Sequence, residues 1–215
     1  VAIQALRQQG TGARQVVECA EGILQGGQRL EGVAYVPRTV ERREEFQGIA
    51  QPLHADAQGV QAGRPDDLAA LEAAGARLVP IDTLHDTRLP ALDGLFIGGG
   101  FPELYARELE ANAALRGRVR SAIDAGLPVY AECGGLMYLA RSLTVAGQTS
   151  RMVGAIPGDV VMRERPVGRG YVVLEETDAF PWPTAGGGRT VRAHEFHYAS
   201  LENLPTDVRC AYAVK

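Results

Sequence analysis

The 215-residue sequence predicts an α/β domain with a mainly parallel sheet, flanked by helices and extended by further strands near its carboxyl end. Between residues 65 and 143, short apolar segments typical of buried strands alternate with segments of helical periodicity. Two of the apolar segments, 92–97 and 127–131, end in a polar or glycine-rich turn where a helical pattern begins. After residue 153 the pattern changes to strands and turns, which we expect to extend the sheet or form an antiparallel flap beside it.

The part of the chain before residue 65 gives weaker signals. Residues 30–37 have the composition of a strand, and the charged residues 38–48 that of a solvated helix or linker. Residues 51–64 show no convincing period and are predicted to be a loop.

From residue 65 onward each element has its own signal. Helical patterns with apolar stripes, and with glycine stops after the first two, cover about 65–75, 102–125 and 136–143. Short apolar runs between them predict strands at 77–81, 92–97 and 127–131. The later strands are predicted at 154–162, 170–176, 190–195 and 208–214.

Composition and charge argue against several classes of protein. The net charge of −4 gives no reason to expect a nucleic acid partner, and no apolar run is long enough for a membrane span. The chain starts at Val1 without a signal-peptide pattern, which we interpret as a piece of a longer polypeptide or a sequence whose start is missing. Because Cys19, Cys133 and Cys210 are widely separated, we expect reduced thiols, no metal site and a cytoplasmic setting.

Cys133 is the first candidate for chemistry, because it stands where a predicted strand ends and a helix begins. Such a turn holds a side chain above the sheet edge, and the N–H groups of the following helix stabilise a thiolate there. Gly134 and Gly135 allow a tight turn of the nucleophile-elbow type. A buried structural cysteine is the competing interpretation, and the local residues alone leave the two about equal.

Gly98, Gly99 and Gly100 follow another predicted strand. Because the carboxyl ends of parallel strands open on the same edge of a sheet, free N–H groups of this loop can form an oxyanion hole with that of Gly134. A flexible strand-to-helix turn is the alternative. A phosphate loop is not indicated, since its Gly-x-x-x-x-Gly-Lys-Ser/Thr pattern is missing from the sequence.

His194 and His197 are the candidate bases for a cysteine nucleophile. Side chains three residues apart on a regular strand face opposite ways, so only one of the two should reach Cys133. Both could instead be strand histidines with satisfied hydrogen bonds. A zinc site is a weaker alternative, because matching Cys or Asp ligands do not accompany them.

Four segments, in the order FIGGGFPELYARELEAN, LPVYAECGGLMYL, GRGYVVLEE and RAHEFHYAS, give a more specific indication. Together they resemble the glutaminase domain of the cobyrinic acid or hydrogenobyrinic acid a,c-diamide synthases, the cobalamin-pathway branch of the class I glutamine amidotransferases. The resemblance covers about residues 65–215 and implies their flavodoxin-like fold. It implies Cys133 as nucleophile, His197 as base, Gly99 and Gly134 as oxyanion-hole donors, and Glu195 as a candidate orienter of the histidine.

The same resemblance implies that residues 49–215 release ammonia from glutamine for the ATP-dependent amidation of the a and c side-chain carboxylates of a corrin ring. The glutaminase domain would need no cofactor. ATP and Mg²⁺ would bind a synthetase domain, in this or another chain, of which residues 1–48 would be a remnant or linker. The sequence departs from the family at 49–64, where a strand and an aromatic segment are usual. A cysteine hydrolase acting on another amide, or a decayed domain kept for binding, are the alternatives.

Overall fold

The computed structural model describes residues 16–17, 49–52, 69, 71–179 and 189–215. The strand predicted at 30–37 and the charged segment 38–48 lie outside the described residues, as does most of the loop predicted at 51–64. Residues 71–73 are helical, as predicted, and the chain turns at Gly75 with a φ of 93°.

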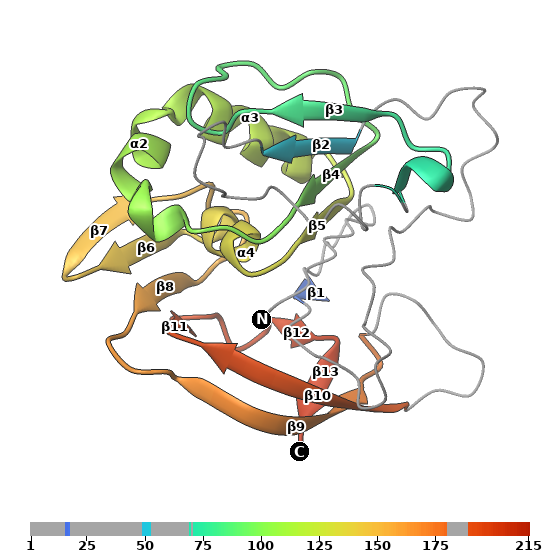
Figure 1. Ribbon diagram of the computed structural model, residues 1–215, viewed down its shortest axis with the longest axis vertical. Helices are drawn as coiled ribbons and strands as arrows, with labels where there is room; N and C mark the ends of the chain where they lie inside the picture. Colours follow the sequence, from blue (N-terminus) through green and yellow to red (C-terminus); the bar gives the residue numbers. More distant parts are fainter. Residues whose placement is uncertain (1–15, 18–48, 53–68, 70, 180–188) are drawn as a thin grey trace.

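A four-stranded parallel sheet forms the upper layer in Figure 1. Its order is β3-β2-β4-β5, and its strands are β2 (Ile49–Pro52), β3 (Leu78–Ile81), β4 (Gly94–Ile97) and β5 (Val129–Ala131). This sheet, together with the helices beside it, confirms the predicted fold class. The loop predicted from residue 51 is wrong at its start, because Gln51 and Pro52 belong to β2. Pairing with β3 and β4, rather than local propensity, makes this segment a strand.

The long helix predicted at 102–125 is broken into three pieces. These are the 3₁₀ helix η1 (Pro102–Leu104), α2 (Ala106–Ala111) and α3 (Ala113–Asp124). The break between α2 and α3 falls at Asn112, whose Oδ1 accepts the N–H of Leu115 at 3.3 Å and caps α3. An interruption by one capping residue leaves the apolar spacing almost unchanged, so periodicity alone did not reveal it.

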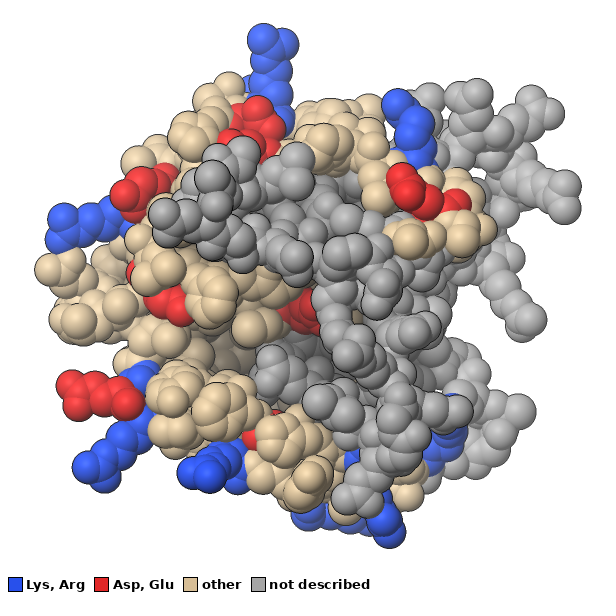
Figure 2. Space-filling model, in the orientation of Figure 1, with Lys and Arg blue, Asp and Glu red and all other residues tan. Residues whose placement is uncertain are grey.

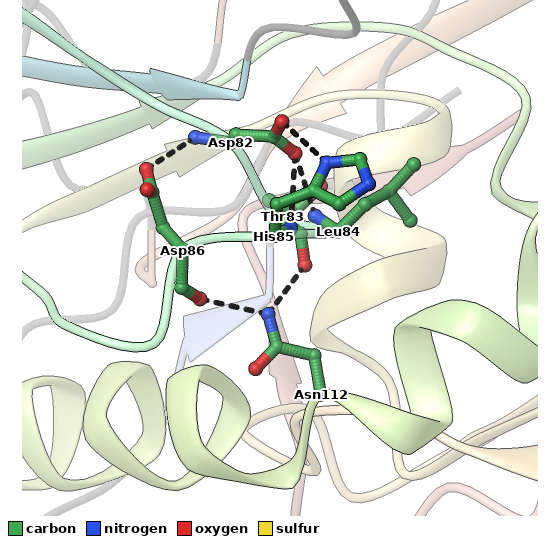
Figure 3. A network of polar contacts seen from close by, with 6 residues as sticks. All are labelled: Asp82, Thr83, Leu84, His85, Asp86 and Asn112. Atoms are coloured by element: carbon green, nitrogen blue, oxygen red, sulfur yellow. Dashed lines mark hydrogen bonds and ion pairs between the residues drawn. The ribbon is translucent and has the colours of Figure 1, made fainter.

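Asn112 also ties α3 to the loop that follows β3 (Figure 3). Its Nδ2 donates to the carbonyl oxygens of Thr83, at 3.0 Å, and Asp86, at 2.8 Å. In the same loop, Asp82 accepts the N–H of Leu84 at 2.8 Å, and its carboxylate lies 2.7 Å from His85 Nδ1. Partial burial would raise the pKa of Asp82, but these hydrogen bonds outweigh burial and lower it. The network fixes the loop at the carboxyl edge of the sheet.

The chain after β5 turns at once into α4 (Gly134–Leu139), which starts and ends earlier than the predicted helix at 136–143. A second four-stranded sheet follows, in the order β11-β8-β6-β7. Its strands are β6 (Ser142–Val145), β7 (Gln148–Arg151), β8 (Asp159–Met162) and β11 (Ala199–Glu202).

The sequence did not predict β6, β7 or β11, and of the strand expected at 154–162 only the part from Asp159 forms. The β6–β7 hairpin turns through Ala146 and Gly147, whose φ angles are 48° and 79°. Two positive φ values define the turn type that usually carries Asn-Gly or Asp-Gly, so alanine in the first position concealed the hairpin.

The lowest layer in Figure 1 is antiparallel, which agrees with the predicted flap. It consists of β9 (Gly168–Glu176) between β10 (Thr190–His197) and β13 (Tyr212–Val214). The strand expected at 208–214 is divided at Ala211 into β12 (Arg209–Cys210) and β13, and β12 pairs with β1 (Val16–Val17).

One apolar core joins the parallel sheet to the helices and to the second sheet. Its fully buried members include Leu115 of α3, Leu139 of α4, Leu143 of β6 and Val160 of β8. Every residue of α4 is buried, so the turn that carries Cys133 rests on a closely packed base. Within the described residues, no helix is long and apolar enough to cross a membrane.

Candidate functional site

Cys133 is the N-cap residue of α4 and an exposed free thiol. Its backbone has φ 46° and ψ −111°, a conformation that residues with a side chain rarely adopt. Strain of this kind costs on the order of 1–3 kcal/mol and persists only where the surrounding structure imposes it. The turn therefore holds the thiol out at the carboxyl edge of the parallel sheet, as the strand–Cys–Gly–Gly–helix pattern predicted.

The strained turn is imposed by close contact between the start of α4 and the end of β4. A Cβ on Gly134 would lie 2.5 Å from the carbonyl oxygen of Gly100, and a Cβ on Gly135 would lie 2.4 Å from that of Ile97. Neither position has room for a side chain. The two glycines thus bring the backbone of α4 against the glycine loop.

Gly99 lies beside the candidate nucleophile. A Cβ on Gly99 would be 3.8 Å from the Cβ of Cys133, so the loop after β4 borders the thiol. In the part of the chain that the structure describes, the N–H groups of Gly99 and Gly134 have no hydrogen-bond acceptor. The next helical N–H groups are occupied, since Gly135 donates to Glu132 at 2.7 Å. Two free backbone donors therefore lie next to Cys133.

Glu103 is a residue near this site that the sequence reasoning did not single out. It belongs to η1, which packs against α4, and it is half-buried. Burial raises the pKa of its carboxyl group. The signal that could have found it is its position just after the glycine loop, in Gly100-Phe101-Pro102-Glu103.

His197, at the end of β10, has both ring nitrogens beside polar atoms. Nδ1 lies 2.8 Å from the carbonyl oxygen of Ala199, and Nε2 lies 3.5 Å from Glu195 Oε2. A carbonyl oxygen can only accept, so Nδ1 carries the proton in the neutral ring and Nε2 keeps the lone pair. The nitrogen that can take up a proton is therefore the one beside Glu195.

His194 lies on the other face of the β9–β10 pair. Its ring meets Tyr171 edge-to-face, with centroids 5.4 Å apart. That outer face also carries the exposed Phe196 and the exposed Arg169 and Arg192, which belong to the lower rim where Figure 2 shows Lys and Arg side chains. The structure thus separates His194 from His197 and Glu195, as the strand alternation predicted.

The predicted site residues fall into two clusters. Cys133, Gly99 and Gly134 lie together at the edge of the parallel sheet, whereas His197 and Glu195 lie together on the antiparallel sheet. Among the described residues, no hydrogen bond joins Cys133 to His197. The second sheet links the clusters, because α4 packs on β6 and β11 directly follows the end of β10 (Figure 1). The described residues contain no group of three or more His, Cys, Asp or Glu side chains that could hold a metal ion.

Comparison with known proteins adds a family to this geometry. Residues 61–214 match the model of the CobB/CobQ-like glutamine amidotransferase domain. A cobyrinate a,c-diamide synthase of Magnetococcus marinus is 43% identical over 150 residues, which cover 70% of this chain and 32% of that protein. The enzyme of the same name from Streptococcus sanguinis is 45% identical over 138 residues, covering 64% of this chain and 30% of the relative.

A third relative, the cobyrinate a,c-diamide synthase of Methanosarcina acetivorans, is 38% identical and covers 69% of this chain and 32% of its own length. The chain therefore spans about a third of the length of the curated relatives it matches. A solved structure of a GMP synthase component from Thermoplasma acidophilum aligns with 80% of this chain at 17% identity and a TM-score of 0.41. A likeness so distant says nothing about activity.

Proposed function

The chain belongs to the family of CobB/CobQ-like glutamine amidotransferase domains, and on that premise we propose that it releases ammonia from glutamine with Cys133 as the nucleophile. The observation that carries the proposal is the strained turn at Cys133, with the free N–H groups of Gly99 and Gly134 beside the thiol. A nucleophile next to unpaired backbone donors is what acyl transfer requires.

The reaction proceeds in two halves. The Cys133 thiolate attacks the side-chain amide carbon of glutamine, and the negative oxygen of the tetrahedral intermediate accepts hydrogen bonds from Gly99 and Gly134. His197 takes the thiol proton and delivers it to the departing nitrogen, which leaves as ammonia. Water then hydrolyses the glutamyl thioester, and His197 accepts its proton before returning it to the thiolate. The balance is one glutamine and one water converted to glutamate and ammonia.

Glu195 receives a role that differs from that of a usual orienting residue. An orienter binds the ring nitrogen remote from the reaction, whereas the Glu195 carboxylate lies beside Nε2, the nitrogen that takes up the proton. Its charge favours the imidazolium that forms after proton uptake. The base must also approach Cys133 during turnover, since catalytic hydrogen bonds are often long in the absence of substrate.

The use of the ammonia follows from the relatives. Since they are named cobyrinate a,c-diamide synthases and the chain spans about a third of their length, the proposal assigns the ammonia to the amidation of corrin a and c carboxylates in cobalamin biosynthesis. A synthetase domain in this or another chain would use ATP and Mg²⁺ for that step. Residues 49–215 then form the amidotransferase domain and residues 1–48 a remnant or linker of the synthetase domain. The free thiols of Cys133 and Cys210 support a reducing, cytoplasmic setting.

One observation favours a different class of protein. Because no described contact joins Cys133 and His197, a decayed domain kept for binding is the second candidate. Such a domain would bind partners without hydrolysing glutamine. A cysteine hydrolase acting on another amide shares the nucleophile and differs only in its substrate.

The proposal is tested by removing the thiol from the intact protein and measuring glutamate release. Cys133→Ala is expected to lower the rate by at least about a thousand-fold, because the nucleophile itself is lost. Cys210→Ala is the matched control, since Cys210 is also an exposed free thiol, and it should retain the wild-type rate. Full glutaminase activity in Cys133→Ala would end the proposal.

A diazo-oxo-norleucine reagent separates the three candidates. Selective capture at Cys133 is expected for a glutamine amidotransferase. A wild-type protein that hydrolyses another amide and is not captured is a cysteine hydrolase of different specificity. Absence of both capture and hydrolysis identifies the binding domain.

A further inference from the structure

We infer that Gly168, together with the carbonyl group of Ala199, positions the imidazole of His197 for proton transfer. The inference rests on the proposed function, because it concerns the base of that reaction. It makes Gly168 a positioning residue, which acts through His197 and does not touch glutamine itself.

The first support is the space that Gly168 leaves open. Gly168 of β9 pairs directly with His197 of β10. A Cβ built on Gly168 would lie 2.1 Å from Nε2 of His197, 2.7 Å from its Cδ2 and 2.8 Å from Oε2 of Glu195. Real Cβ atoms do not approach other atoms so closely, so the ring and the carboxylate occupy the volume that a side chain would fill.

The backbone of Gly168 does not itself require glycine. Its φ lies outside the left-handed region, in contrast to the φ of 144° at Gly170 two residues later. An alanine at position 168 would therefore suffer no backbone strain. What excludes a side chain at position 168 is His197 and Glu195.

The second support is the bond that fixes the ring in this position. His197 Nδ1 donates to the carbonyl oxygen of Ala199 at 2.8 Å, two residues further along the chain. In a serine–histidine–aspartate triad a carboxylate accepts this hydrogen bond and sets the tautomer. Here a backbone carbonyl accepts it, while Glu195 lies beside the other nitrogen. The ring cannot move away from residue 168 without changing this hydrogen bond.

Both contacts act on the nitrogen that carries out the chemistry. The Ala199 carbonyl keeps the proton of the neutral ring on Nδ1, which leaves the lone pair on Nε2. Gly168 lets Nε2 lie close to the backbone of β9, within 3.5 Å of Glu195. A methyl group at position 168 displaces the ring, breaks the hydrogen bond to Ala199 and misplaces the base.

The experiment compares glutamate release by Gly168→Ala and Gly94→Ala variants of the intact protein. Gly94 is a buried strand glycine whose Cβ would meet its nearest atom, the Pro128 carbonyl oxygen, at an ordinary 3.7 Å. Gly168→Ala is expected to lower kcat about 100-fold, with KM for glutamine changed by less than about three-fold. Gly94→Ala should keep the wild-type kcat. A wild-type kcat in Gly168→Ala overturns the inference.

A double variant shows whether Gly168 acts through His197. In a His197→Gln background, adding Gly168→Ala should change kcat by less than about two-fold, because the group that Gly168 positions is already gone. A further loss of about 100-fold in that background overturns the inference in favour of a general structural effect. If His197→Gln alone keeps the wild-type rate, the base assignment of the proposed function fails, which is a separate result.

A measurement on the unmodified protein decides the matter if Gly168→Ala does not fold. The sequence has four histidines, so the ring nitrogens of His197 can be assigned in a ¹⁵N NMR spectrum by comparison with His197→Gln. The expected neutral form carries its proton on Nδ1. A neutral ring protonated on Nε2 contradicts the hydrogen bond to Ala199 and overturns the inference.

Discussion

Gly134 and Gly100 lie backbone to backbone, so that a Cβ on Gly134 would be 2.5 Å from the carbonyl oxygen of Gly100. This contact joins the start of α4 to the glycine loop after β4, and it sets the distance between the thiol and the loop. Because both partners are backbone, neither can rotate away to make room.

Gly134→Ala is therefore expected to push α4 away from the loop and to displace both Cys133 and the oxyanion-hole donors. We expect a free energy of unfolding lower by about 1–3 kcal/mol and a rate of glutamate release lower by about 100-fold. Gly117→Ala in α3 is the control, since its Cβ would meet nothing within 4 Å; it should raise the stability by about 0.5–1 kcal/mol. Thermal melts and the glutaminase rate test both variants, and unchanged values in Gly134→Ala would contradict the packing argument.

The two histidines of β10 give a paired prediction. His197→Gln should lower the glutaminase rate by about 100-fold or more, because it removes the proposed base. His194→Gln should leave the rate within about two-fold of wild type, since His194 faces Tyr171 on the opposite side of the sheet. The same kinetic measurement serves both variants. The opposite result, with activity lost only in His194→Gln, would reassign the base.

Asp159 predicts a pH-dependent stability. The hydrogen-bonded guanidinium of Arg141 holds the pKa of its carboxyl far below the usual range; Ser142 Oγ at 2.7 Å and Asn203 Nδ2 at 2.9 Å add to the effect. A depressed pKa stabilises the folded state above the pKa of the unfolded chain, about 3.9, and this contribution is lost as the pH falls through the folded-state pKa.

Asp159→Asn should therefore lower the free energy of unfolding by about 2 kcal/mol at pH 7, and the difference from wild type should shrink below about pH 4. Urea unfolding at several pH values measures it. Asp124→Asn is the control, because Asp124 pairs with Arg120 across a largely exposed helix surface and should change the stability little. A pH-independent loss in Asp159→Asn would show that its charge is not responsible.

Local patterns account for the parts of the fold and site that the sequence predicted. The elbow at Cys133 could be predicted because strand, cysteine, glycines and helix follow one another directly, and the parallel strand ends then brought Gly99 to it. The β6–β7 hairpin could not, because Ala146 stands where the turn usually has Asn or Asp. The contact of Gly168 with His197 depends on the register of two strands, which only the folded sheet establishes. Family resemblance, rather than spacing, singled out His197 over His194.

Tyr138 of α4 gives a prediction of opposite sign, because removing its polar atom should stabilise the protein. Its hydroxyl is buried, and the described residues offer it no hydrogen-bond partner. Burial raises the pKa of this phenol, so the group stays neutral throughout the ordinary pH range. An unsatisfied buried hydroxyl costs about 1–3 kcal/mol, and phenylalanine keeps the ring that fills the core.

Tyr138→Phe is therefore expected to raise the free energy of unfolding by about 1 kcal/mol and to leave glutamate release unchanged. The matched control is Tyr130→Phe, because the Tyr130 hydroxyl donates to Glu132 at 3.3 Å and its removal should be neutral or destabilising. Denaturant unfolding of the three proteins under one condition checks the sign. A less stable Tyr138→Phe would show that the hydroxyl has a hydrogen-bond partner in solution. A buried water between it and Arg116, whose charge acts on the phenol, would then be the first arrangement to examine.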